Sequence, residues 1–220
     1  MKLDVQRDIM QINNDIAAEN RKAFETSGLF VINLIGSPGS GKTTLLERLI
    51  STLPELKIGV IEGDLATARD AQRIAEQGVQ VVQVNTDGGC HLDARMISRI
   101  LPVFDLSVLD LLIIENVGNL VCPASYDLGE DMRLLLLSVA EGTDKPGKYP
   151  TTFVTADAVI INKLDMLELT DFDMQTARAD ILAIKPQVEI FETICRAGHV
   201  KGLNAVAEYI QQHIGIKRGL

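Results

Sequence analysis

The stretch FVINLI at residues 30–35, followed by GSPGSGKT at residues 36–43, decides the fold of this chain. The apolar run predicts a buried strand, and the second segment matches GxxxxGK[ST] between a strand and a helix. Glycines let such a loop curl so that successive N–H groups point at phosphate oxygens. We therefore predict a nucleotide site, and a glycine-rich turn that binds no ligand is the alternative. The residues predicted to contact the nucleotide are Gly36, Ser37, Pro38, Gly39, Ser40, Gly41, Lys42, Thr43 and Thr44.

A second motif, NKLD at residues 162–165, directly follows the apolar run Ala158–Ile161. A carboxylate at Asp165 can accept hydrogen bonds from N1–H and the N2 amine of guanine, whereas adenine has no N2 amine. We expect Asn162 to join this loop to the phosphate loop and the Lys163 stem to cover the base. The motif predicts GTP as the nucleotide, and a solvated turn is the alternative.

Acidic residues at two strand ends are candidates for Mg²⁺ binding and for catalysis. Asp64 closes the segment IEGD, Glu115 closes the segment IIE, and Asp70 lies in the following helix. Carboxylates at such positions bind Mg²⁺ directly or through water, together with the Thr43 hydroxyl. Asp64 could instead cap the next helix. The catalytic residues that we predict are Lys42, Thr43, Asp64 and Glu115.

The segment after Glu115 differs from a usual GTPase loop. Glu115-Asn116-Val117-Gly118 stands where DxxG is expected, no glutamine or cis arginine stands out as the catalytic device, and the residue that positions the attacking water is unassigned. We therefore expect slow intrinsic hydrolysis, which suits a switch.

The rest of the chain alternates between strand-like and helix-like runs. This alternation predicts a three-layer α/β fold with a mostly parallel sheet and helices on both faces. Residues 3–26 have isoleucines at a helical spacing and predict an N-terminal amphipathic helix. We expect an appendage at 1–27 and a P-loop GTPase domain at 28–220. The expected strands are 30–35, 57–62, 79–84, 111–115, 134–140, 158–161 and 188–191, and the expected helices are 42–53, 66–77, 92–101, 171–185 and 203–213.

Composition excludes several classes of partner. The formal net charge of −9 argues against nucleic acid, because phosphate-binding proteins usually carry a basic excess. Apolar runs stay shorter than the roughly 18 residues of a membrane helix, and the charged start does not resemble a signal peptide. We expect a cytoplasmic protein that binds neither nucleic acid nor membranes. In that compartment the 3 cysteines should be reduced thiols or metal ligands.

Two of those cysteines follow strands whose ends lie at the nucleotide edge of the predicted sheet. Cys90 and His91 follow the run 79–84, and Cys122 follows the run 111–115. Because ligands of parallel sheets bind at the carboxyl ends of the strands, these three side chains could be neighbours. Thiolate and imidazole suit Zn²⁺ or Ni²⁺. Spacing alone leaves open a pair of small buried cysteines beside a surface histidine.

The motifs together resemble those of the HypB family of nickel-hydrogenase maturation GTPases, whose nearest sister is the urease accessory protein UreG. The resemblance covers about residues 28–215, and the segments GGCHL and ENVGNLVCP distinguish it from UreG-like proteins; the other shared segments are GSPGSGKTTLLERL, EGDLATARDAQRI, NTDGGCHLDARMI, KYP and NKLD. Some members of the family begin with a CxxCGC high-affinity nickel motif or with a histidine-rich tract. This chain has neither, so we expect no nickel storage. Its Cys195 loop also departs from the usual SAKTG-like pattern.

The resemblance implies a fold of the SIMIBI class of P-loop NTPases and a homodimer favoured by GTP. It implies nickel or zinc bound at the subunit interface by Cys90, His91 and Cys122, and a nucleotide contact across the dimer by Lys148. The implied partners are the nickel metallochaperone HypA and the large subunit of [NiFe] hydrogenase. The implied function is gating of nickel insertion. A targeting or assembly GTPase with incidental cysteines is the main alternative, and an ATP-dependent kinase is a third.

Overall fold

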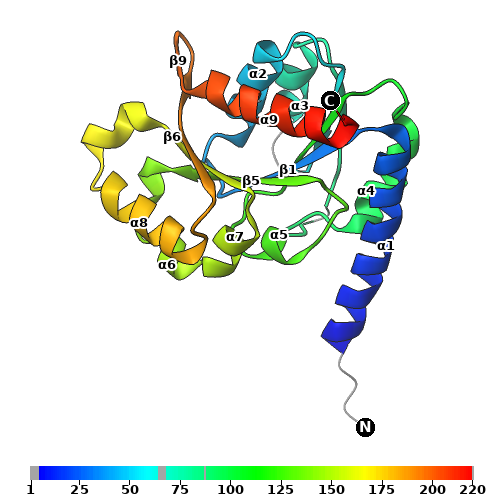
Figure 1. Cartoon of the computed structure of the whole chain (residues 1–220), viewed down its shortest axis with the longest axis horizontal. Helices are drawn as coiled ribbons and strands as arrows, with labels where there is room; N and C mark the ends of the chain where they lie inside the picture. The colour runs from blue at the N-terminus through cyan, green and yellow to red at the C-terminus, as the bar shows by residue number, and fades with distance from the viewer. Residues whose placement is uncertain (1–4, 64–67, 87, 220) are drawn as a thin grey trace.

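The computed structural model describes residues 5–63, 68–86 and 88–219, with all side chains in these ranges except those of residues 5–8 and 68–71. Seven parallel strands form one sheet in the order β3-β2-β4-β1-β5-β6-β7. They are β1 (Phe30–Gly36), β2 (Ile58–Glu62), β3 (Gln80–Gln83), β4 (Leu111–Glu115), β5 (Met132–Ser138), β6 (Ala158–Asn162) and β7 (Glu189–Glu192). Figure 1 shows the centre of this sheet, where β1 lies beside β5. The strand that precedes GSPGSGKT thus lies at the centre of the sheet.

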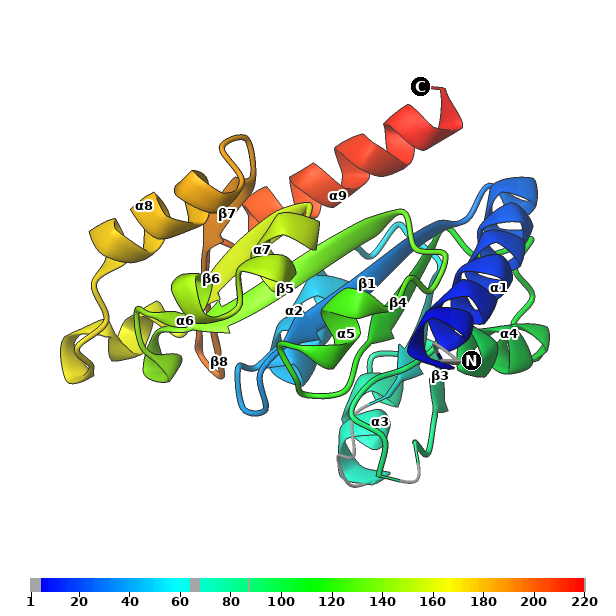
Figure 2. The same cartoon turned by 90° about the horizontal axis from the view of Figure 1, so that it is seen from below.

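Helices cover both faces of this sheet, as Figure 2 shows from a second direction. They are α1 (Val5–Ser27), α2 (Lys42–Thr52), α3 (Ala68–Ala75), α4 (Ala94–Ile100), α5 (Cys122–Ser125), α6 (Lys145–Lys148), α7 (Pro150–Thr155), α8 (Met174–Ile184) and α9 (Leu203–Arg218). Alternate side chains of β1 face opposite layers, because successive strand residues point to opposite faces. Ile32 packs in a cluster with α2 and α9, whereas Val31 packs in a cluster with α1 and α4. The predicted three-layer α/β fold is therefore confirmed.

Helix α1 is present as predicted, but its isoleucines do not form the buried face. Its buried residues are Asn13, Ala17, Asn20 and Phe24, whereas Ile9 and Ile12 have exposed fractions of 50% and 59%. Asn20 Nδ2 donates to the carbonyls of Ala94 and Leu128 at 2.9 and 3.1 Å. Hydrogen bonds to main-chain carbonyls thus attach α1 to α4 and to the loop before β5.

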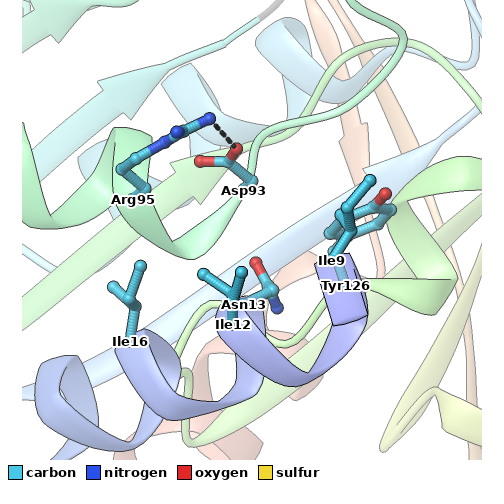
Figure 3. Close-up of a pocket in the computed structure, with 7 residues that line it drawn as sticks. All are labelled: Ile9, Ile12, Asn13, Ile16, Asp93, Arg95 and Tyr126. Atoms are coloured by element: carbon cyan, nitrogen blue, oxygen red, sulfur yellow. Dashed lines mark ion pairs between the residues drawn. The ribbon is translucent and has the colours of Figure 1, made fainter. Parts of the chain in front are cut away.

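The isoleucines of α1 instead line one side of a shallow groove of about 220 Å³. Figure 3 shows Ile9, Ile12 and Ile16 along α1, with Tyr126 beside Ile9 and the ion pair of Asp93 and Arg95 opposite. The apolar stripe of α1 therefore lies at the edge of the fold, half in contact with solvent.

Most element boundaries lie within three residues of those predicted. Strand β5 ends at Ser138 rather than at Ala140, because Ser138 caps a 3₁₀ turn over Val139–Glu141. Helix α8 begins at Met174 rather than at Asp171, because the Asp173 side chain accepts from the amides of residues 175 and 176. An antiparallel hairpin of β8 (Ile194–Arg196) and β9 (His199–Lys201) was not predicted. Among the described residues, no helix is both long and apolar enough to cross a membrane.

Candidate functional site

The loop after β1 has the backbone of a phosphate cradle. Gly39 and Gly41 adopt φ values of 74° and 101°, in the left-handed region that favours glycine. A Cβ atom on Gly41 would come within 2.7 Å of Asn162 Nδ2, so the position also needs glycine for space. Lys42 Nζ lies 3.5 Å from the carbonyl oxygen of Gly36 and 3.4 Å from that of Ser37. Its ammonium group therefore lies against the cradle, within reach of a bound phosphate.

Beside the cradle is a phosphate-side pocket of about 270 Å³, lined by Gly39, Gly41, Lys42, Thr43, Thr44, Arg73, Glu115 and Lys163. Thr43 Oγ1 donates to Glu115 Oε1 at 2.9 Å. A hydroxyl and a carboxylate so close together form the hard oxygen donor set that fits Mg²⁺. Arg73, on α3, was not predicted as a residue of this site, because nothing in the sequence distinguishes it from a surface arginine. In the structure it pairs with Glu47 at 2.8 Å.

Two predicted Mg²⁺ ligands lie outside the described part of the chain. These are Asp64, whose position is not described, and the side chain of Asp70.

The NKLD segment meets the phosphate loop at the end of β6. Asn162 Nδ2 donates to the Ser40 carbonyl at 3.0 Å, and Thr193 Oγ1 donates to Asn162 Oδ1 at 3.0 Å. Lys163 has a φ of 64°, and its Nζ lies 2.5 Å from the Gly39 carbonyl. The buried amide of Asn162 thus holds the two loops of the nucleotide site together.

Next to this junction is a base-side pocket of about 360 Å³, lined by Gly41, Thr44, Asn162, Lys163, Asp165, Met166, Cys195 and Arg196. Asp165 has an exposed side-chain fraction of 16% and pairs with the more exposed Arg196 at 3.3 Å. The pocket therefore presents one carboxylate on a partly apolar lining. Arg196 and Cys195 come from the β8–β9 hairpin, and without a prediction of that hairpin the sequence alone did not indicate Arg196.

Cys90, His91 and Cys122 converge although their loops follow different strands. Their potential ligand atoms all lie within 4.8 Å of one another. Cys90 Sγ lies 3.5 Å from His91 Nδ1, and the His91 ring stacks on Tyr126 with the centroids 3.8 Å apart. We call these three residues the Cys–His cluster. Two thiols and an imidazole are the soft donors that bind Ni²⁺ or Zn²⁺.

The protonation states of the Cys90 thiol and the His91 imidazole follow from their surroundings in the cluster. A hydrogen bond with the Cys122 side chain, together with burial, raises the pKa of the Cys90 thiol above its ordinary value. Burial lowers the pKa of His91, which keeps the imidazole neutral and able to donate a lone pair to a metal. A divalent cation would stabilise the second thiolate, which the neighbouring sulfur otherwise disfavours.

Lys148 lies apart from both nucleotide pockets of its own chain. It is on α6, where it is largely exposed and pairs with Asp144 at 2.5 Å. It lines a different, open pocket that also includes Gly142, Thr143 and Asp171. Within one chain, therefore, Lys148 does not join the nucleotide site.

Comparison with known proteins agrees with this geometry. The profile of the family described as "CobW/HypB/UreG, nucleotide-binding domain" matches residues 30–192. Hydrogenase maturation factor HypB of Azotobacter vinelandii is 46% identical over 216 residues, which cover 98% of this chain and 71% of that protein.

Two crystal structures show the same fold. HypB from Archaeoglobus fulgidus has a TM-score of 0.87 and 38% identity, and the match covers 93% of this chain and 99% of that one. HypB from Helicobacter pylori in complex with nickel has a TM-score of 0.86 and 44% identity, and the match covers 94% and 95% of the two chains. Similarity of this extent, in sequence and in structure, means that the chain belongs to the HypB group of the CobW/HypB/UreG family of nucleotide-binding proteins.

Proposed function

We propose that this protein binds Mg·GTP, hydrolyses it slowly and uses the nucleotide state to gate nickel insertion into [NiFe] hydrogenase. Family membership supports nucleotide binding and hydrolysis in general. Selection of guanine and binding of metal rest on residues of the base-side pocket and of the Cys–His cluster, whereas the partners rest on similarity to HypB.

The base-side pocket supports guanine over adenine. Asp165 is the carboxylate in this pocket, and guanine offers it two N–H donors. Adenine would leave the carboxylate without those donors, at a cost of about 1–3 kcal/mol. The Lys163 stem, anchored at the Gly39 carbonyl, would cover the face of the base.

Hydrolysis would transfer the γ-phosphoryl group to water, breaking the bond to the bridging oxygen and yielding GDP and phosphate. Lys42 would neutralise charge on the β- and γ-phosphates. Bound Mg²⁺, held by Thr43 and Glu115 with Asp64 or Asp70 as further candidates, would supply further charge neutralisation. Arg73 is an arginine of the same chain that lines the phosphate-side pocket. We propose slow turnover on the sequence, where no residue for positioning the attacking water was identified.

The observation that carries the metal proposal is the convergence of Cys90, His91 and Cys122 within 4.8 Å. Three donors leave one position of a tetrahedral site for water or for a ligand from a second subunit. We propose that a homodimer favoured by GTP completes the site, that HypA supplies nickel and that the large subunit of the hydrogenase receives it. Zn²⁺ fits the same donors.

Metal binding by Cys122→Ala tests this proposal, with Cys195→Ala as the matched control. Cys195 is a buried thiol outside the cluster, so its loss should leave metal affinity unchanged. Equilibrium dialysis with Ni²⁺ and Zn²⁺ should find about one metal per subunit or per dimer in the wild type. Cys122→Ala should lose at least about tenfold in affinity, because it removes one of three ligands. Unchanged affinity in Cys122→Ala, with no effect of a GTP analogue on metal binding, would favour a targeting or assembly GTPase.

A further inference from the structure

We infer that Asn119 transmits the state of the phosphate loop to the Cys–His cluster. The inference rests on the proposed function, since it identifies the residue through which nucleotide would gate metal binding. It assigns to Asn119 a positioning role: the residue contacts the loops that carry the ligands and is itself no ligand.

The main chain of Asn119 is attached to the phosphate loop. Asn119 N donates to the Gly36 carbonyl at 3.0 Å, and the two residues form an isolated antiparallel bridge. The preceding residue is packed as closely, because a Cβ atom on Gly118 would come within 3.0 Å of both Pro38 N and Pro38 Cα. A displacement of the backbone at residues 36–38 would therefore displace residues 118 and 119 with it.

The Gly36 carbonyl has a second contact, and this contact links it to the nucleotide. Lys42 Nζ lies 3.5 Å from the same oxygen. A phosphate in the cradle attracts this ammonium group, since the two carry opposite full charges. Nucleotide binding thus alters the environment of the carbonyl that holds Asn119.

The side chain of Asn119 reaches both loops that carry ligands. Its Nδ2 donates to the main-chain carbonyl of Cys90 at 3.2 Å. Its Oδ1 accepts from the amide of Val121 at 2.8 Å, directly before Cys122. One carboxamide therefore bonds to the backbone of one ligand residue and to the neighbour of another.

A second asparagine nearby has a different role. Asn116 is fully buried and donates to Asn33 Oδ1 at 3.1 Å, while its own Oδ1 accepts from the Leu92 amide at 3.1 Å. These bonds join the segment after His91 to strand β1 inside the core, so they form a fixed frame. Asn119 is only partly buried and lies at the phosphate loop, outside this buried frame.

The test measures how nucleotide changes metal affinity. The dissociation constant for Zn²⁺ and for Ni²⁺ is determined by competition with a chromogenic chelator, without nucleotide and with a non-hydrolysable GTP analogue. The ratio of the two constants is the coupling, which typically lies between about 5 and 150 for linked sites. In Asn119→Ala we expect the ratio to fall toward the coupling that dimer formation alone contributes, while nucleotide affinity and nucleotide-free metal affinity change less than about threefold.

Two further variants sharpen the test. Gly118→Ala should also lower the ratio, because its methyl group separates the segment from Pro38. Asn204→Ala, an exposed asparagine on α9, should keep the wild-type ratio. A wild-type ratio in both Asn119→Ala and Gly118→Ala would overturn the role of Asn119 and leave the gating function standing. A loss of metal affinity in Asn119→Ala that is the same with and without nucleotide would have the same meaning. A ratio of 1 in the wild type would overturn the gating function itself.

Discussion

We propose that the choice of base depends on Asp165. Its carboxylate is largely buried in the base-side pocket, and its ion pair with the exposed Arg196 adds little, since exposed partners are screened by water. In Asp165→Asn we expect GTP affinity to fall by about 10–100-fold, because the amide offers only one acceptor and turns an N–H group toward guanine. Xanthosine triphosphate, whose ring has a carbonyl at position 2, should gain affinity. Competition against a fluorescent nucleotide measures both changes, and unchanged metal binding is the control for folding. Equal affinities for GTP and ATP in the wild type would contradict the assignment.

We expect the proton on Cys90 to make metal binding depend on pH. The pKa of this thiol is raised by its contact with Cys122 and by burial, so near neutral pH the thiol is protonated in the metal-free protein. A bound cation requires the thiolate and releases that proton. Apparent affinity for Zn²⁺ should therefore rise with pH, by up to about tenfold per unit for this proton. The lowered pKa of His91 means that its imidazole is already neutral over the same range and adds no slope.

Measurements between pH 6.5 and pH 8 check this dependence, since they lie above the ordinary pKa of about 6.5 for histidine. Cys90→Ser should bind more weakly and with a shallower slope. An affinity that does not change with pH in the wild type would show that Cys90 is not a ligand.

At the scale of elements, α1 is held by asparagines rather than by its isoleucines. Asn20→Ala would leave the carbonyls of Ala94 and Leu128 buried without this donor. We expect a loss of about 1–3 kcal/mol in the free energy of unfolding. Ile12→Ala should change it by less than about 0.5 kcal/mol, because Ile12 is exposed. Urea denaturation followed by circular dichroism compares the two variants. Equal losses would mean that the groove beside Ile12 contributes to stability.

Strands β4 and β5 and helix α1 show which features of an element could be predicted from the sequence. Strand β4 has its predicted bounds, Leu111–Glu115, because it is apolar on both faces and so carries a simple signal. Strand β5 begins two residues before its predicted start, because Arg133 interrupts the apolar run while binding Glu130 inside the fold. The buried face of α1 could not be predicted, since asparagine becomes a buried residue only when its carbonyl partners are known.

For the candidate site, the sequence predicted which loops lie at one edge of the sheet. It also predicted that the loops after β3 and β4 could be neighbours, but not that β2 lies between those two strands. It did not predict the β8–β9 hairpin, whose two strands have only three residues each and of which β9 is exposed throughout. Contributions that depend on such tertiary contacts, among them that of Arg196, therefore became evident only in the structure.

At the scale of the whole molecule, two features are incomplete within the part of one chain that the structure describes. The Cys–His cluster supplies three donors, one fewer than a tetrahedral site, and Lys148 lies outside the nucleotide pockets of its own chain. Both features are consistent with a site completed by a second copy. Closed twofold dimers place such residues reciprocally, so that each copy completes the site of the other.

A GTP analogue should therefore convert the 24.0 kDa chain into a particle of twice that mass, as measured by light scattering after size exclusion. Lys148 is well placed to contribute, because its partner Asp144 is as exposed as the lysine itself and water screens the pair. The lysine can leave that partner for a phosphate presented by another chain, where a multiply charged anion attracts it more strongly. Lys148→Ala should weaken the GTP-dependent dimer by about tenfold or more, whereas Lys22→Ala, an exposed lysine on α1, should not. High salt should weaken the wild-type dimer in the same direction, since it screens the same attraction. A dimer equally stable with GDP and with the GTP analogue would contradict a contact that depends on the γ-phosphate.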